Sequence, residues 1–447
     1  MLPLTYQFNL TQTAAAPFYQ LGNVPDKKKL AGTFLAGAFS QLSNSSLRGT
    51  YVEHSPHRSY VMQWNTNIQR ELLPNLTGSV GYVGSRGVHL PFRVDDANMV
   101  IPTKTPAGYL WPQVDVNGNI PTSACNADPN QCFPPDPINT KFGRTNATLY
   151  MGNSYYHALE LQLVNRMSHG LQVQGAYTWS KSIDNNSATI AGDQFGNGIA
   201  SLDWFDGRRS RGVSDFNIGR TLVINAIWQV PGLKSASGPA TWVLNGWQLG
   251  AIYKASDGAP FTPTIGTDGD PLGKLNDSPF DYANRVPGCN PINRNFKKDP
   301  SGNLLYVNPN CFAMPTAPSP AFFNAAQPLG CDPAPPTFGG PLPSGDLRCF
   351  NLGGNPGRNI LVGPGISELD FSVFKNNNIK RISETFNVQF RVEFFNILNH
   401  ANFAVPVTPD NTDMFDSTGT ILTGVAGLLT STSTDPREIQ FALKFVW

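Results

Sequence analysis

The chain has 447 residues, of which 14% are charged, and its formal net charge at pH 7 is +1. Soluble domains usually contain about 25% charged residues, and a membrane-spanning helix needs about 18 consecutive apolar residues. The longest apolar runs, 30–39 and 421–429, are too short for such a helix. The net charge is small, and the lysines and arginines do not cluster into a basic stripe. We therefore expect no nucleic acid as a partner.

Alternation of apolar and polar residues with a period of two predicts ten β-strands. In the strand expected at 384–396, Phe386, Val388 and Phe390 alternate with Asn387 and Gln389. Most of these strands are longer than the five or six residues usual in soluble proteins. Ten residues tilted by about 45° cross about 23 Å, close to the apolar band of an outer-membrane barrel. The expected strands are 4–12, 60–69, 75–84, 154–165, 170–181, 218–230, 245–256, 366–374, 384–396 and 437–447.

The gaps between these strands alternate strictly between long and short. Outer-membrane barrels have short periplasmic turns and long external loops, and therefore show this alternation. The sequence predicts an all-β, antiparallel transmembrane β-barrel in the outer membrane, whose last strand ends at the periplasm. A soluble β-sandwich or propeller is the alternative, which the strand length and the gap pattern disfavour. The expected external loops are 13–59, 85–153, 182–217, 257–365 and 397–436.

Aromatic residues on the apolar faces of these strands are expected at the two membrane interfaces, against outer-membrane lipid. The periplasmic group is Trp228, Trp247, Phe386 and Trp447. The outer group is Tyr60, Tyr82, Tyr155, Trp179, Tyr253 and Phe394. The opposite faces predict a polar interior that includes Gln172, Gln174, Gln389, Arg391, Glu393 and Gln440.

Three long segments resemble the barrels of Oar-like TonB-dependent receptors, a large bacterial outer-membrane family. They begin YVMQWNTNIQ (60–90), NSYYHALELQ (153–185) and ELDFSVFKNN (368–403). The segment SDFNIGRTLVINAIWQVP (214–231) and the C-terminal strand are also similar to this family.

The resemblance implies uptake of an external ligand across the outer membrane, driven by the TonB complex. It implies a barrel of about 22 strands with a plug in its lumen. No plug or TonB box precedes the first expected strand, so residues 1–447 are expected to be the C-terminal part of such a barrel. TonB would then act through a missing N-terminal region. The apolar face of the last strand resembles the signal read by the barrel-assembly machinery, through Ile439, Phe441, Leu443, Phe445 and Trp447.

Two other functions remain open at this point: a structural or adhesive barrel, and a passive pore closed by these ten strands alone. An enzyme is the least favoured, because no catalytic motif appears. No cofactor is expected. Asp115–Asn119 and Asp268–Asp270 hint at calcium loops, but neither completes the ligand pattern, and turns explain them better. No metal site is therefore expected.

The cysteines and one charged cluster of the loops allow two further predictions. All six cysteines lie in loops, which favours disulfides over free thiols and an oxidising compartment. Cys125 and Cys132 are the expected pair, and the pairing of Cys289, Cys311, Cys331 and Cys349 is left open. A charged cluster at the barrel mouth is expected to hold its loop by ion pairs, with screening of anionic ligands as the alternative. Its members are Asp203, Asp206, Arg208, Arg209, Arg211 and Asp215.

Overall fold

The computed structural model describes most of the chain. The described residues are 49–94, 97–98, 101, 103–105, 108–110, 145–187, 204–233, 239–265, 281–298, 302–313, 350–351, 356–379, 381, 383–406, 412–415, 420–422 and 424–447. None of the helices in these ranges is long and apolar enough to span a membrane.

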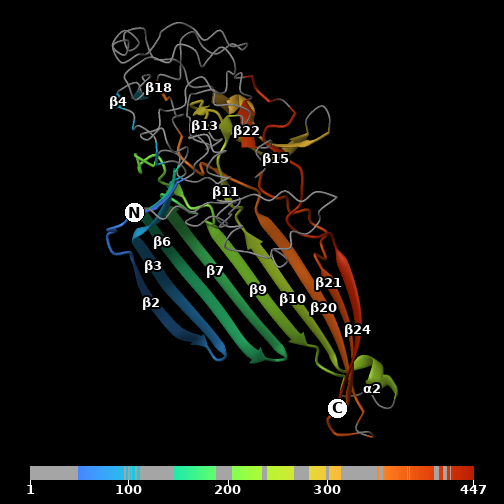
Figure 1. Ribbon diagram of the computed structural model, residues 1–447. Coiled ribbons are helices and arrows are strands. Elements are labelled where there is room, and N and C mark those ends of the chain that lie inside the picture. The colour runs from blue at the N-terminus through green and yellow to red at the C-terminus, as the bar shows by residue number, and fades with distance from the viewer. Residues whose placement is uncertain are drawn as a thin grey trace, which may run out of the picture.

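Nine long strands form an antiparallel meander in which each strand pairs with the next along the chain (Figure 1). The all-β antiparallel fold expected from the sequence is thereby confirmed. Nine of the ten expected strands are present, and the one expected at 4–12 lies outside the described residues. The nine are β2 (Tyr60–Leu73), β3 (Leu76–Val94), β6 (Thr145–Ser168), β7 (Leu171–Asp184), β9 (Arg220–Gln229), β10 (Trp247–Ser256), β20 (Ile366–Asn378), β21 (Asn387–Phe395) and β24 (Glu438–Val446).

Two short strands also join this sheet. The first, β1 (Gly49–Val52), pairs in parallel with β6, and the second, β8 (Gly212–Val213), pairs with β7. Along the path of nine, β2 and β24 are the two end strands, and they lie on opposite edges of the sheet (Figure 1). Each of them has one partner strand among the described residues, β3 and β21 respectively.

The turns at one end of the sheet are short, as expected. Asn75 in the β2–β3 turn has a φ of 71°. His169 and Gly170, between β6 and β7, have φ of 52° and 79°, which suits a two-residue hairpin turn. A helix, α2 (Pro239–Leu244), lies between β9 and β10 at this same end, near the C-terminus (Figure 1).

Both boundaries of one expected loop are wrong. The loop predicted at 85–153 is shorter, because β3 continues to Val94 and β6 starts at Thr145. The alternation of apolar and polar residues stops at Gly84–Gly87, and register shifts between Val88, Leu90 and Phe92 interrupt it further along β3. Beyond the shifts, Phe92 and Val94 are fully buried against Ala147. The other boundaries lie closer: β10 ends at Ser256 and β20 begins at Ile366, which fits the loop expected at 257–365.

The long loops fold into small sheets at the opposite end of the molecule (Figure 1). In two of these sheets, β5 (Gly108–Leu110) pairs with β4 (Thr103–Thr105) and β18 (Phe350–Asn351), and β16 (Leu304–Val307) pairs with β15 (Ile292–Lys298) and β23 (Leu428–Leu429). In a third, β12 (Thr264–Ile265) pairs with β13 (Asp281–Tyr282) and β22 (Asp413–Phe415). The remaining two are the pairs β11 (Pro260–Phe261) with β19 (Leu361–Val362) and β14 (Asn284–Arg285) with β17 (Phe312–Ala313). A short 3₁₀ helix, η5, spans Pro309–Cys311.

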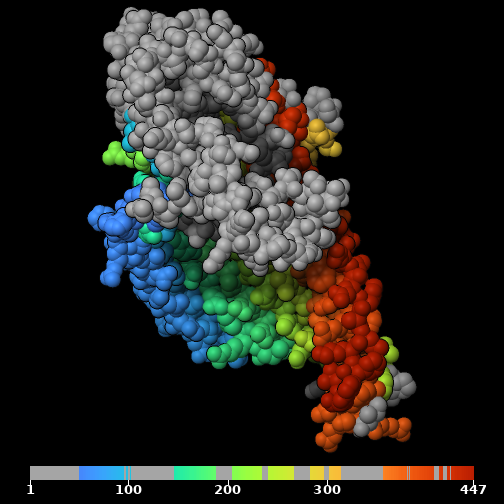
Figure 2. Space-filling view, in the orientation of Figure 1, coloured from blue at the N-terminus to red at the C-terminus, as the bar shows by residue number. Residues whose placement is uncertain are grey.

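The register places the apolar face of every long strand on the same side of the sheet. Along one row, Ile68, Val80, Leu161, Tyr177 and Leu222 are successive cross-strand partners. Near the other edge, Val373, Val392 and Phe441 form such a row. Figure 2 shows the strands as adjoining bands from blue to red. We call the apolar side of the sheet, defined by these cross-strand rows, the outward face.

Large apolar side chains on the outward face are exposed rather than buried. The exposed fraction is 71% for Ile68, 62% for Trp179 and 67% for Phe441. A contiguous apolar surface of this kind is rare on soluble monomers, and it fits contact with lipid hydrocarbon. The side chains on the other face are mainly polar. We call this polar side the lumenal face.

Candidate functional site

Polar side chains on the lumenal face are linked to one another across strands. Asn376 Oδ1 accepts hydrogen bonds from Asn387 Nδ2 at 3.0 Å and Gln389 Nε2 at 2.8 Å. Arg391 donates to Gln389, and its guanidinium lies 5.1 Å from the centre of the Phe374 ring. This part of the wall is therefore polar, and the Arg391 guanidinium lies against an amide oxygen and an aromatic ring.

A buried ion-pair cluster stands above the lumenal face where the strands meet the loops. We call it the Arg358 knot, and it comprises Arg358, Asp184, Asp215, Ser187 and Asn359. The Arg358 guanidinium pairs with the carboxylates of Asp184 and Asp215, the latter at 3.1 Å. The three side chains are only 2%, 3% and 0% exposed. Arg358 also donates to Ser187 Oγ at 2.9 Å.

Asn359 extends the knot into the loop that begins after β10. Its Nδ2 donates to Asp215 Oδ1 at 2.5 Å and to the Val213 carbonyl at 2.7 Å. Its backbone N–H donates to Thr262 Oγ1 at 2.8 Å. Asp184 ends β7, Asp215 follows β8, and Arg358 precedes β20. The knot therefore fastens both ends of the loop 257–365 to the rim of the sheet.

Burial raises the pKa of the Asp215 carboxyl above its ordinary value, although Arg358 and Asn359 partly oppose the shift. Desolvation disfavours the ionised carboxylate, and the nearby Asp184 carboxylate acts in the same direction. Asp215 Oδ2 has no hydrogen-bond partner among the described residues. The charge balance of the knot thus depends on the one guanidinium.

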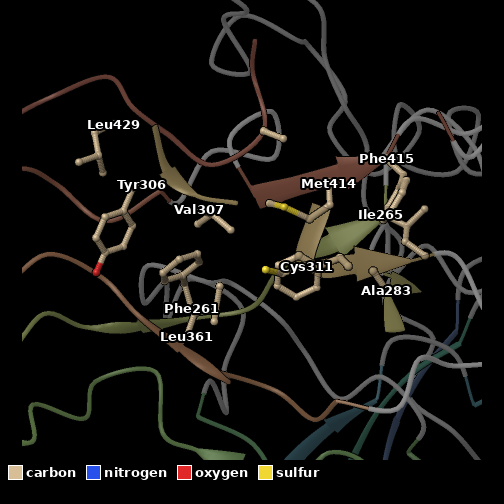
Figure 3. Close-up of a cluster of buried hydrophobic side chains, with 12 residues drawn as sticks. Phe261, Ile265, Ala283, Tyr306, Val307, Cys311, Leu361, Met414, Phe415 and Leu429 are labelled. Atoms are coloured by element: carbon tan, nitrogen blue, oxygen red, sulfur yellow. The ribbon is translucent and has the colours of Figure 1, made fainter. Parts of the chain in front are cut away.

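The loops have a hydrophobic core of their own, shown in Figure 3. Phe261, Ile265, Val307 and Met414 are fully buried in it. Burial raises the pKa of the Tyr306 hydroxyl to about 12, and this hydroxyl donates to the Val362 carbonyl at 2.6 Å. Segments from 260–265, 281–313, 359–362 and 412–429 contribute to this core, so we call it the loop core.

A disulfide joins Cys289 to Cys311 at the loop core, with a Cα–Cα distance of 5.3 Å. The sequence had left the partners of these two cysteines open. Cys125 and Cys132, the pair expected from spacing, lie outside the described residues, as do Cys331 and Cys349. Their pairing stays a prediction.

A cavity of about 1070 Å³ lies between the loop core and the rim of the sheet. Arg220, Arg285, Arg294 and His400 line it together with Asp257. Arg220 makes a bidentate ion pair with Asp257, at 2.9 and 3.0 Å. Arg220 is the cross-strand partner of Trp179, so the side chain lies on the outward face. This cavity therefore adjoins the outer surface of the wall rather than the lumen.

The charged cluster expected at the barrel mouth is only partly brought together. Asp215 belongs to the Arg358 knot, and its carboxylate pairs with Arg358 rather than with an arginine of the cluster. Asp206 Oδ1 accepts from the Arg208 backbone N–H at 3.2 Å, and Arg211 lies 5.7 Å from the Tyr155 ring centre. Asp203 lies outside the described residues, and Arg209 has contacts of its own.

Sequence reasoning missed Arg358, Asp184 and Asn359. Asp184 closes a strand, while Arg358 and Asn359 follow a Gly/Pro-rich stretch without periodicity. Arg358 lies 143 and 174 positions from its two carboxylate partners, so no local signal links them.

The expected interfacial aromatics lie on the outward face. The exposed fraction is 41% for Trp228 and 62% for Trp179. The Trp247 indole donates to the Val243 carbonyl of α2 at 2.8 Å, and the Tyr253 hydroxyl lies 3.2 Å from Ser367 Oγ. Trp228 and Trp247 flank the connection that carries α2, while Tyr253 lies near the loop end of β10. Their depth in a membrane stays a prediction.

The residues expected to form the assembly signal lie on the outward face of β24 or at its end. The exposed fractions are 51% for Ile439, 67% for Phe441, 57% for Leu443, 51% for Phe445 and 83% for Trp447. Phe441 stacks on Phe390 of β21, with 6.4 Å between ring centres. Recognition by the barrel-assembly machinery stays a prediction.

The turns considered as calcium loops lie outside the described residues. In the described ranges, no group of three or more His, Cys, Asp or Glu side chains is placed to hold a metal ion. Neither observation assigns a metal or cofactor to the chain.

Comparison with known proteins gives a family match. The family model described as "Outer membrane beta barrel domain" matches residues 2–440. A comparison with curated proteins finds no match.

Two solved structures are also similar to the chain. The outer membrane transporter YddB from Escherichia coli is 10% identical, with 90% of this chain and 34% of that chain covered and a TM-score of 0.36. The FrpB iron transporter from Neisseria meningitidis (F3-3 variant) is 10% identical, with 88% and 32% covered and a TM-score of 0.31. The chain thus spans about a third of the length of these two proteins.

Proposed function

This chain belongs to the outer membrane β-barrel domain family, and we propose that it is part of the wall of an Oar-like TonB-dependent receptor. The chain is a multi-pass β-protein of the outer membrane. In the proposed receptor, this wall cooperates with a plug supplied by a segment outside the chain. The TonB complex acts on that segment, and an external ligand is taken up.

The observation that carries the proposal is the two-faced wall. Nine strands present one apolar and one polar face in continuous register, as a transmembrane barrel requires. The segments that resemble Oar-like receptors, 60–90, 153–185 and 368–403, coincide with β2–β3, β6–β7 and β20–β21. The likeness therefore falls on the strands of the wall and on their turns.

The Arg358 knot supports a role of the loops in ligand capture. It holds the loop 257–365 at the lumenal rim of the sheet, next to the entrance of the proposed lumen. Residues held on a rigid scaffold are suited to recognition, since less order must be imposed on binding. The proposal assigns no chemical step to the chain, and the class of ligand is left to experiment.

The DNA upstream of codon 1 provides the first test. We expect an in-frame segment that encodes a plug and a TonB box. The gene product including that segment should copurify with the periplasmic domain of TonB, and a product without the box should not.

Uptake provides the second test. Cells carrying the receptor should accumulate one member of a radiolabelled panel of ferric siderophores, oligosaccharides and peptides, and they should do so only when TonB is present. Absence of the upstream segment, with single-channel conductance from the refolded chain, would favour a passive pore. Absence of both would favour a structural or adhesive barrel.

A further inference from the structure

An apolar groove crosses the outward face at the N-terminal side of the sheet. It has a volume of about 470 Å³, within the range of small-molecule pockets. Its lining is almost entirely apolar, and the floor lies at Gly175 of β7, where a Cβ would meet no atom within 4 Å. Leu163, Tyr177 and Ile224 form its walls.

The groove follows from the register. In one row across the sheet, Arg70, Gly78, Leu163, Gly175 and Ile224 are successive cross-strand partners. The neighbouring row, which contains Val80 and Tyr177 beside these two glycines, has no glycine. Two glycines in one row therefore leave a hollow between ridges, and the hollow opens toward hydrocarbon.

Among the described residues that line the groove, Arg70 has the only charged side chain. It lies on β2 three residues before that strand ends at Leu73, beside the short turn to β3. With about 3.3 Å per residue and a tilt of about 45°, it lies roughly 7 Å from the end of the strand. That depth places the guanidinium within reach of the headgroups of the periplasmic leaflet, which an arginine on a lipid-facing surface approaches by extending its side chain.

The positive charge of Arg70 indicates that the ligand of the groove is anionic. Among the described residues, no ion pair includes Arg70. A cation on a lipid-facing surface is stabilised by an anionic headgroup, and the groove beside it suits an acyl chain. We propose that this groove binds an anionic phospholipid of the periplasmic leaflet, with its phosphate on Arg70 and an acyl chain over Gly175.

The test uses the full chain, reconstituted in vesicles of equal phosphatidylglycerol and phosphatidylethanolamine, extracted in mild detergent and examined by native mass spectrometry. We expect the wild-type chain to retain phosphatidylglycerol with about a fivefold preference, since one arginine at a membrane surface contributes on that scale. Arg70→Gln should abolish the preference, and Arg70→Lys should keep it. Gly175→Leu fills the floor and should remove the retained lipid.

Ala251→Leu is the matched control, because it adds the same side chain to the same face outside the groove. It should retain phosphatidylglycerol as the wild type does. Each variant is first checked for heat-modifiable migration, so that only folded protein is compared. The proposal is overturned if the wild type shows no preference, if Gly175→Leu retains lipid normally, or if the groove is instead occupied by a second copy of the chain, seen as a dimer mass that Gly175→Leu abolishes.

Discussion

Removing the guanidinium from the Arg358 knot should release the loop 257–365 from the rim of the sheet. In Arg358→Met, the carboxylates of Asp184 and Asp215 would remain buried at 3% and 0% exposure without a cation. Breaking a buried ion pair from one side is destabilising by about 3–5 kcal/mol. Even the lower value shifts the equilibrium between docked and released loop by roughly a hundredfold.

Hydrogen exchange of the refolded chain measures this shift directly. Amides around 182–187, 212–217 and 356–361 should lose about a hundredfold in protection, while β20 and β21 should keep theirs. Arg211→Met is the control, because Arg211 is an exposed arginine of the same region. The triple variant Arg358→Met, Asp184→Asn, Asp215→Asn should recover much of the protection, since it leaves no buried charge unpaired.

The pH dependence adds a second readout. A carboxyl whose folded pKa is raised contributes stability below its unfolded pKa, and this contribution is lost as pH rises through the folded pKa. Burial already raises the pKa of Asp215 in the wild type, and loss of Arg358 should raise it further. The released loop of Arg358→Met should therefore redock as the pH falls through the raised pKa of the Asp215 carboxyl. Protection that is unchanged by Arg358→Met, or lost equally in Arg211→Met, would refute the role given to the knot.

Three further predictions concern the wall and the loops. Phe441→Asp places a charge on the lipid side of β24 at a cost of up to about 2–4 kcal/mol, so it should block membrane assembly, as should deletion of Trp447. Gln440→Asp, on the lumenal face, is the control. Normal heat-modifiable migration of both Phe441→Asp and the Trp447 deletion would argue against an assembly signal. The wild-type chain itself should migrate differently before and after boiling, and identical migration would count against a closed barrel. Cys289→Ser with Cys311→Ser should lower the stability of the loop core by about 3 kcal/mol, measured as faster tryptic cleavage within 281–313; an unchanged cleavage rate would contradict this.

The long strands were predictable because each carries its own local signal. The alternation in Phe386–Phe390 or Ile439–Phe445 predicts both that the segment is a strand and which of its side chains share the apolar face. The register between β21 and β24 then places these two apolar faces on the same side of the sheet. Val223 and Ile227 show the limit of hydrophobicity alone. They are apolar, yet their cross-strand partners Ala176 and Gln172 place them on the lumenal face.

The loops were predictable in position but not in structure. The Arg358 knot and the loop core join segments more than a hundred residues apart, and such contacts leave no period in the sequence. The strand extension to Val94 was missed for a different reason, since a register shift erases the alternation while pairing continues.

The most direct test of the two-faced wall is a spin-label scan of β9 in the full chain, reconstituted in vesicles. Labels at Leu222, Ile224 and Ala226 should collide with oxygen dissolved in lipid, while labels at Val223, Asn225 and Ile227 should not, and should instead report the polar or protein-filled lumen. Val223 and Ile227 are decisive, because their hydrophobicity alone would place them in lipid. Equal oxygen accessibility at all six positions, or lipid contact at Val223 and Ile227, would contradict the account.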